Sequence, residues 1–305
     1  GIIAVCAPDI VFLADRDGDG MVDFRETLFT GFRVRTLERG INNPRWGFDN
    51  WIYVGGGGEG GRITGPHLKD AVDLGGTDFR IKADGSAIEP VTGRVGTFGM
   101  TLNQVGDRFP SSGGTPAIYA LPIPYRYLQR NPFVASPGMN YQASDYNRGF
   151  RISDPHPWRV KRQQDPAWIK FYGSRETNSN YFSGGCSTEF YGGGRFPSGY
   201  VGNLFYCEPS LNIIHRTVLS RDRNGYVARR ARVERESEFL ASTDQWFRPM
   251  SLRFGPDGSL YIVDMYREII EDYSAIPRFL QQQYGLNRGG DRGRIWRLAS
   301  DSIER

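Results

Sequence analysis

The sequence lacks the features that mark nucleic-acid binding or membrane insertion. Lysine is rare, since only Lys69, Lys82, Lys161 and Lys170 occur, and the arginines are interleaved with 34 acidic residues. A net charge of +4 spread in this way gives no basic stripe, so we do not expect a nucleic-acid partner. No apolar run approaches the roughly 18 residues of a membrane span.

Cysteine is also scarce, with Cys6, Cys186 and Cys207 as the three examples. None lies in a CxxC pair, which argues against a zinc site or a covalently attached haem in this chain. Cys186 and Cys207 flank what look like adjacent strands. Cys186 and Cys207 could form a disulfide in an oxidising compartment, or they could be two buried free thiols.

The chain begins without methionine or a signal segment, on the apolar run 2–5. We therefore expect a fragment of a longer exported protein in which the start of the fold is missing.

Glycine is abundant, with 39 residues, and 13% of the chain is aromatic. Short strands joined by tight turns produce such a composition. Residues 46–54 and 254–263 share one pattern, an aromatic-Gly step, an Asp turn and an apolar-Tyr-apolar strand, and Asp84-Gly85 predicts a hairpin. Such recurring units favour an all-β fold, a β-propeller.

We expect residues 1–305 to form one propeller domain, six-bladed in the full protein. Residues 124–168 are rich in Pro, Arg, Asn and Asp without periodicity, which indicates a long surface excursion. Residues 266–284 are predicted to be partly helical, with an interruption at Pro277.

Residues 15–26 fill the twelve-position template of a calcium loop, with Gly20 at the sharp turn. The flanks look strand-like, so we expect a calcium-clipped hairpin, not a helix-loop-helix sensor. An acidic turn without metal is the alternative. The predicted ligands are the carboxylates and one backbone carbonyl of Asp15, Asp17, Asp19, Met21 (carbonyl), Asp23 and Glu26.

Several sequence blocks in a fixed order resemble the propeller domain of the membrane-bound dehydrogenases of planctomycetes and related bacteria, a haem-binding family. The blocks are 7–10, 46–53, 78–80, 202–209 with 215–216, 238–249, and 256–258 with 263–267. The chain departs from the family at the glycine run 55–61 and at residues 103–109.

More distantly, the chain is similar to soluble quinoprotein sugar dehydrogenases. This resemblance implies a periplasmic or extracellular dehydrogenase of a sugar or alcohol, dependent on Ca²⁺ and pyrroloquinoline quinone (PQQ). The resemblance to the haem-binding family implies membrane association through missing segments, and electron transfer to a fused or partner cytochrome c domain whose haem c lies outside this chain.

Propeller sites form where inner strands begin and the next strands end. Such positions give the candidate cofactor- or substrate-binding residues Asn43, Glu208, Arg248, Asp264, Tyr266 and Arg267. Arg248 and Arg267 could supply guanidinium forks to the carboxylates of a quinone. A structural salt bridge between Asp264 and Arg267 is the plainer alternative.

Hydride abstraction from a sugar needs a general base, for which histidine is the usual choice. His215 and His67 are the candidates, and His156 lies between prolines in the predicted excursion. A packed role is equally open for His215, which falls on a predicted strand.

Two other functions remain open. One is a non-catalytic propeller that binds glycans or proteins. The other is a calcium-dependent hydrolase or lactonase, which needs an axial metal held by Glu208, Asp264 and Asn43.

Overall fold

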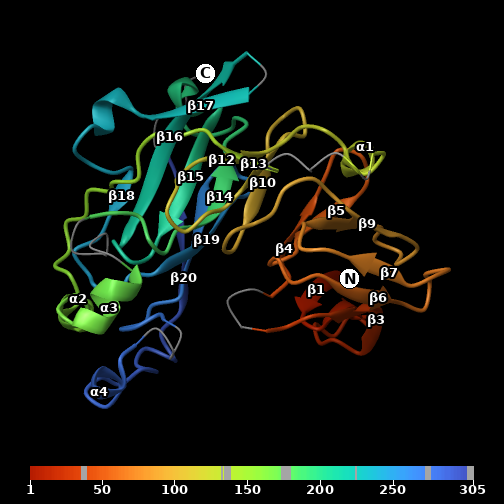
Figure 1. Ribbon diagram of the computed structural model, residues 1–305, viewed down its shortest axis with the longest axis horizontal. Helices are drawn as coiled ribbons and strands as arrows, with labels where there is room; N and C mark the ends of the chain where they lie inside the picture. The colour runs from red at the N-terminus through yellow and green to blue at the C-terminus, as the bar shows by residue number, and fades with distance from the viewer. Residues whose placement is uncertain are drawn as a thin grey trace. The chain divides into compact units, whose positions relative to one another are not determined.

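The computed structural model describes residues 1–35, 40–131, 133, 139–172, 180–223, 225–271 and 276–300. Strands dominate these residues and the helices are short (Figure 1). The strands of this described part form six sheets, built mainly from antiparallel neighbours. The expected all-β, propeller-type fold is confirmed.

The chain divides into two compact units, each described by itself below. One contains residues 1–110 and 119–141, and the other contains residues 111–118 and 142–305. The expectation of one domain over residues 1–305 stays a prediction.

The first unit begins with a five-stranded sheet. Its spatial order is β1 (Ile2–Cys6), β2 (Asp9–Ala14), β3 (Phe24–Phe32), β6 (Gly61–Thr64) and β7 (Val72–Leu74). The second sheet has the order β4 (Asn42–Trp46), β5 (Ile52–Gly55), β8 (Phe79–Ile81) and β9 (Ile88–Pro90). Apolar residues of both sheets, including Ile10, Phe29, Val54 and Phe79, form one buried cluster.

The strands of these two sheets do not follow the chain in simple order. β6 and β7 come between β5 and β8 in sequence but join the first sheet. The glycine run makes this crossing possible, because a Cβ at Gly61 would lie 2.3 Å from the Gly31 carbonyl oxygen.

Two small sheets and a short helix follow. They are β10 (Met100–Leu102) with β11 (Arg108–Pro110), β12 (Ile118–Ala120) with β13 (Asn140–Gln142), and α1 (Tyr125–Leu128).

The second unit contains two larger sheets. The first has β14 (Cys186–Phe190), β15 (Asn203–Glu208), β16 (Ile213–Asp222) and β17 (Gly225–Arg230), with β18 (Leu240–Ala241) paired to β16. The other has β19 (Pro249–Phe254), β20 (Leu260–Asp264) and β21 (Arg294–Leu298). Cys186 and Cys207 lie opposite each other on β14 and β15, buried as free thiols.

The helices of the second unit are one or two turns long. They are α2 (Pro157–Gln163), α3 (Pro166–Tyr172), α4 (Arg278–Gln281) and the 3₁₀ turns η3 (Ser198–Tyr200) and η4 (Arg232–Glu234). α4 begins after Pro277, within the stretch 266–284 that we predicted to be partly helical. The prediction is wrong for residues 266–271, which form no helix, and residues 272–275 lie outside the described residues.

The predicted surface excursion, residues 124–168, is more ordered than expected, with 132 and 134–138 outside the description. It contains α1, α2 and β13, and α2 buries Trp158 to 1% exposure among Ile269, Ile276 and Leu280. The prolines that suggested irregular chain instead start helices, because proline suits the first helical turn.

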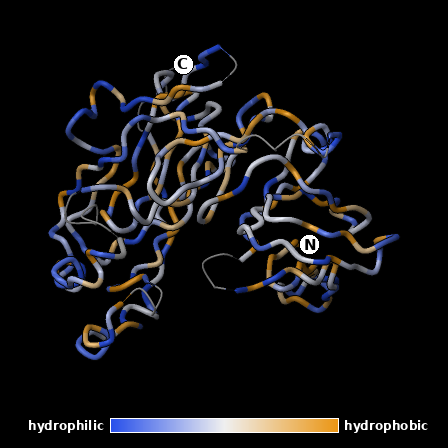
Figure 2. The backbone as a smooth tube through the Cα atoms, viewed as in Figure 1, coloured by the Kyte–Doolittle hydropathy of each residue, from blue (hydrophilic) through white to orange (hydrophobic). Residues whose placement is uncertain are grey.

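No helix in the described part of the chain is both long and apolar enough to cross a membrane. Figure 2 shows why, since apolar and polar residues are interleaved along the whole trace.

Candidate functional site

Most of the predicted binding residues meet where β15 and β20 end and β19 begins. Arg248 lies directly before β19, and its backbone N–H donates to Asp264 Oδ1 at 2.8 Å. Its guanidinium donates to the carbonyl of Pro209, the neighbour of Glu208, at 2.7 Å. The structure therefore brings Glu208, Arg248, Asp264, Tyr266 and Arg267 together at one location of the second unit.

The two arginines are occupied by backbone oxygens. Besides Pro209, Arg248 donates to the carbonyls of Arg267 at 3.0 Å and Glu268 at 2.7 Å. Arg267 donates to the Met265 carbonyl at 2.9 Å and to the Gly289 carbonyl. In this arrangement neither guanidinium is presented as a fork, and the pair does not fit a quinone carboxylate.

Asp264 is an anchor for the surrounding backbone. Its carboxylate accepts from the N–H groups of Arg248 and Tyr266 and from the Trp296 indole at 3.0 Å. These bonds, rather than the salt bridge to Arg267 that we considered, satisfy a carboxylate that is 1% exposed.

Glu208 is fully buried at the end of β15. Its carboxylate accepts from the backbone N–H groups of Ser183 at 2.9 Å, Gly184 at 3.0 Å and Ser210 at 3.0 Å. Burial raises the pKa of Glu208 to about 7, and the N–H groups oppose this effect. With three donors already on this carboxylate, and three on Asp264, neither geometry fits an axial metal ligand.

Partly exposed aromatic side chains lie at the end of β20, beside the buried carboxylates of Glu208 and Asp264. Tyr266 has a φ of 49°, unusual for a bulky residue, and its ring lies 5.9 Å from Trp246. The guanidinium of Arg294 lies 3.9 Å from the Tyr266 ring centroid, and Trp296 is 46% exposed. We call Trp246, Tyr266, Arg294 and Trp296 the aromatic group.

Only Tyr266 of this group was predicted. Trp246 lies in a block that carried the family resemblance, but no chemistry was assigned to it. Arg294 and Trp296 come from β21, whose pairing with β20 puts Arg294 opposite Asp264. That pairing joins segments far apart in the chain, so no local sequence pattern predicts it.

His215 is fully buried on β16 and is enclosed on both sides of its ring. Nδ1 lies 2.7 Å from Glu238 Oε2, and because an ionised carboxylate only accepts, Nδ1 carries the proton. Nε2 lies 2.8 Å from the Tyr146 hydroxyl. Burial lowers the pKa of His215 despite the Glu238 carboxylate. This favours the packed role over the catalytic base.

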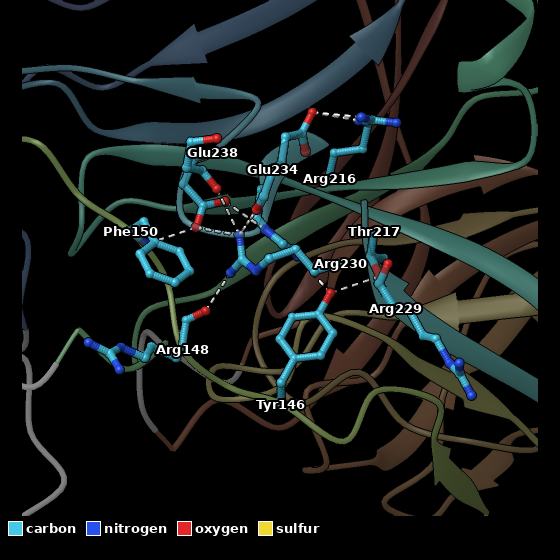
Figure 3. Close-up of polar contacts among 11 residues, drawn as sticks. Tyr146, Arg148, Phe150, Arg216, Thr217, Arg229, Arg230, Glu234 and Glu238 are labelled. Carbon is cyan, nitrogen blue, oxygen red and sulfur yellow. Dashed lines mark hydrogen bonds and ion pairs between the residues drawn. The ribbon is translucent and has the colours of Figure 1, made fainter. Parts of the chain in front are cut away.

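Arg230 is a further member of this network, and Figure 3 shows its contacts with Glu238 and Arg148. Its guanidinium donates to Glu238 Oε1 at 2.9 Å and to the Arg148 carbonyl. Glu238 also accepts from the Phe150 N–H at 2.8 Å, while Tyr146 bonds Thr217 at 2.9 Å. No role was predicted for Glu238, because only the fold shows that its side chain is buried.

The other two histidines have structural contacts as well. His156 caps α2, accepting the Trp158 N–H on Nδ1 at 3.3 Å, and its Nε2 lies 3.3 Å from Glu268. His67, the second predicted base, lies in the first unit with Nε2 2.7 Å from Glu26 Oε1.

The acidic loop joins β2 to β3, so its flanks are strands, as predicted. Carboxylate oxygens of Asp15, Asp17 and Asp19 lie within 4.8 Å of one another and are exposed. Hydrogen bonds from the N–H groups of Gly18 and Gly20 lower the pKa of Asp15, and both glycines have a positive φ, 82° and 88°. Three ionised carboxylates this close form a donor set that fits Ca²⁺.

The later ligand positions of the template are engaged otherwise. Asp23 accepts the Arg16 N–H at 2.9 Å, and Glu26, on β3, holds His67. The strand carries Glu26 away from the loop, whereas in a helical hand it would fold back.

Asn43, the remaining predicted binding residue, belongs to the first unit. It has a φ of 53° on β4, and its amide donates to the Met100 carbonyl at 2.9 Å.

Comparison with known proteins places the chain in one family. The chain is similar to several solved structures, three of which are described here, and no curated protein matches it. A glucose dehydrogenase is 17% identical with a TM-score of 0.46, over 84% of this chain and 68% of that one. An oxidoreductase of Thermus thermophilus, described as a glucose dehydrogenase, is 19% identical with a TM-score of 0.44, over 84% and 68%. The soluble aldose sugar dehydrogenase of Escherichia coli is 16% identical with a TM-score of 0.40, over 84% and 74%. The model of the family described as a domain of unknown function, DUF7133, matches residues 1–302, and the chain belongs to this family.

Proposed function

We propose that the chain is a saccharide-binding propeller whose binding surface is the aromatic group at the end of β20. The observation that carries this proposal is the left-handed Tyr266, with a φ of 49°, beside Trp246. A bulky residue in this conformation is strained and persists only where its surroundings hold it. Asp264 holds the Tyr266 N–H, which keeps the ring at the surface.

The chemistry of the group suits a sugar ring. A pyranose has an apolar C–H face that packs on aromatic rings and a hydroxyl edge that needs charged or polar partners. Asp244, which raises the pKa of Tyr266 by accepting a hydrogen bond from its hydroxyl, and Arg294 supply such partners.

A glycan array followed by titration calorimetry tests this proposal. Trp246→Ala and Tyr266→Ala should each weaken binding about tenfold, which corresponds to about 1.4 kcal/mol. Trp46→Ala is the matched control, because Trp46 is 63% exposed in the other unit. Equal affinity in all three variants, or no glycan bound by the wild type, refutes the proposal.

A PQQ-dependent sugar or alcohol dehydrogenase is the second candidate. Arg292 and Arg294 are exposed beside Tyr266, and both act electrostatically on its hydroxyl. They are cations that an anionic cofactor could use where Arg248 and Arg267 cannot. A quinone would supply hydride acceptance, and a linked cytochrome c domain would take the electrons.

This candidate is tested by adding PQQ and Ca²⁺ to the full-length protein and measuring dye reduction over a panel of sugars and alcohols. Turnover lost in Arg294→Ala supports it. The absence of both quinone-dependent absorbance and turnover removes it and leaves saccharide binding without oxidation. A lactonase is disfavoured, since Glu208 and Asp264, two of its three candidate metal ligands, are buried and each accepts hydrogen bonds from three N–H groups.

We also propose that Asp15, Asp17, Asp19 and the Met21 carbonyl bind Ca²⁺, with Asp23 as a further ligand after it releases the Arg16 N–H, whereas Glu26 stays with His67 on β3. The ion would fix the β2–β3 connection and take no part in substrate chemistry. An exposed loop of this kind suits the high calcium levels outside cells, which accords with a periplasmic or extracellular location.

A further inference from the structure

The first unit contains a cavity of about 360 Å³ that the proposed function does not use. Its lining residues come from β5, β8 and β9 and the residues that follow β9, from the turn between β10 and β11 and the start of β11, and from the segment 120–129 that includes α1. Its volume falls in the lower part of the range of small-molecule sites.

The floor of the cavity is a fixed polar surface formed by Arg80, Glu89 and Tyr53. Arg80 Nε donates to Glu89 Oε1 at 2.6 Å, and its Nη1 donates to the Tyr53 hydroxyl at 3.2 Å and to Asp49 at 2.6 Å. The Arg80 side chain is 18% exposed and packs over Trp51 at 4.5 Å, whereas that of Glu89 is 44% exposed. Arg80 thus holds the carboxylate of Glu89 and the hydroxyl of Tyr53, two residues that line the cavity, in fixed positions.

A second buried arginine supports the back of the cavity. Arg108 is 6% exposed, and it donates to Asp78 Oδ2 at 3.0 Å and to the Thr92 carbonyl. The Tyr53 ring lies between the two guanidiniums, 5.7 Å from Arg108 and 5.8 Å from Arg80.

The opposite wall is apolar. It consists of Leu121, Pro122, Ile123 and Pro124, and Thr92 fixes it by donating its hydroxyl to the Ile123 carbonyl. Arg126 and Gln129, both exposed, stand at the rim.

The charges around the cavity nearly cancel. The three arginines Arg80, Arg108 and Arg126 are matched by four carboxylates, those of Asp49, Asp78, Glu89 and Asp107, so the cavity has no excess positive charge that would select an anion. A polar floor facing an apolar wall recognises a ligand with hydroxyl groups on one side and C–H groups on the other. We propose that this cavity binds a neutral polyol of the size of a mono- or disaccharide, at a site separate from the aromatic group.

Titration calorimetry of the full chain with maltose, and with gluconate as an anionic probe, tests this proposal. Maltose should bind at two independent sites. Glu89→Gln and Pro122→Trp, which fills the mouth from an exposed position, should each remove one site or weaken it at least tenfold. Asp70→Asn, exposed in the same unit, is the control.

The variants separate this site from that of the proposed function. Trp246→Ala should leave the cavity site intact, so a site that persists in that variant and disappears in Pro122→Trp supports the inference. No maltose bound by Trp246→Ala, gluconate bound more tightly than maltose, or wild-type binding in Pro122→Trp would overturn it. None of these results decides whether the aromatic group binds glycans.

Discussion

Arg297 lies directly opposite Tyr261 on the neighbouring strand, and its Nε donates at 2.7 Å to Asp257 in the turn before that tyrosine. Arg80, Tyr53 and Asp49 repeat this arrangement in the other unit, with Arg80 opposite Tyr53 and bonded to Asp49 at 2.6 Å. In each case the tyrosine hydroxyl also donates to the aspartate. The same arrangement of arginine, tyrosine and aspartate therefore occurs in two different sheets, as expected for the blades of a propeller.

Asp257 should make stability pH-dependent in acid. Desolvation opposes its ionisation, yet hydrogen bonds from Arg297 and the Ser259 N–H lower the pKa of Asp257 to about 2, from 3.8. Because the folded pKa is depressed, the stabilisation is complete above about pH 4 and is lost as the pH falls toward 2. Urea unfolding between about pH 5 and pH 2.5 should show a steeper loss in the wild type than in Asp257→Asn. Asp70→Asn should retain the wild-type slope, and equal slopes in all three proteins would contradict this assignment.

Chelation should lower the melting temperature. A ligand that binds only the folded state at about 100 times its Kd contributes about 2.7 kcal/mol, so EDTA should lower the melting temperature by several degrees. Asp17→Asn combined with Asp19→Asn should melt at the EDTA value and no longer respond to Ca²⁺. A wild type indifferent to EDTA would show that the loop is an acidic turn without metal.

Local patterns predicted those parts of the molecule in which a few neighbouring residues set the geometry. The Asp turns before Tyr53 and Tyr261, the Asp84-Gly85 hairpin and the strand flanks of the acidic loop are of this kind. Strand ends were located well enough to bring Arg248, Asp264 and Tyr266 together.

What the side chains do at those positions was not predictable in the same way. The sequence shows that Arg248 carries guanidinium N–H donors. It does not show that three backbone carbonyls from segments distant in the chain already accept hydrogen bonds from them. From the sequence, His215 suits a general base as well as it suits a packed role. The structure distinguishes the two, because Glu238 and Tyr146 contact both of its ring nitrogens. The crossing of β6 and β7 into another sheet depends on contacts between segments far apart in the chain, which hairpin rules do not contain.

Glu208 should produce the opposite pH dependence to Asp257. Its pKa is raised from 4.5 to about 7, so the folded state holds a proton that the unfolded state releases. The stabilisation is complete below about pH 4.5 and is lost as the pH rises through about 7, by about 3 kcal/mol in all. Glu208→Gln should remove this slope between about pH 4.5 and pH 8 in urea titrations. A slope that persists in Glu208→Gln would assign it to another group.

The network of Figure 3 should be essential for the stability of the second unit. Glu238 is fully buried and accepts from His215, Arg230 and the Phe150 N–H, so Glu238→Gln sets an amide N–H₂ group against donors. Breaking a buried ion pair on one side costs about 3–5 kcal/mol. The urea midpoint of Glu238→Gln should therefore fall sharply, whereas Glu236→Gln, two residues away and exposed, should unfold like the wild type. A small effect in both variants would mean that Arg230 and His215 find other partners, and that the enclosure of His215 is weaker than its contacts indicate.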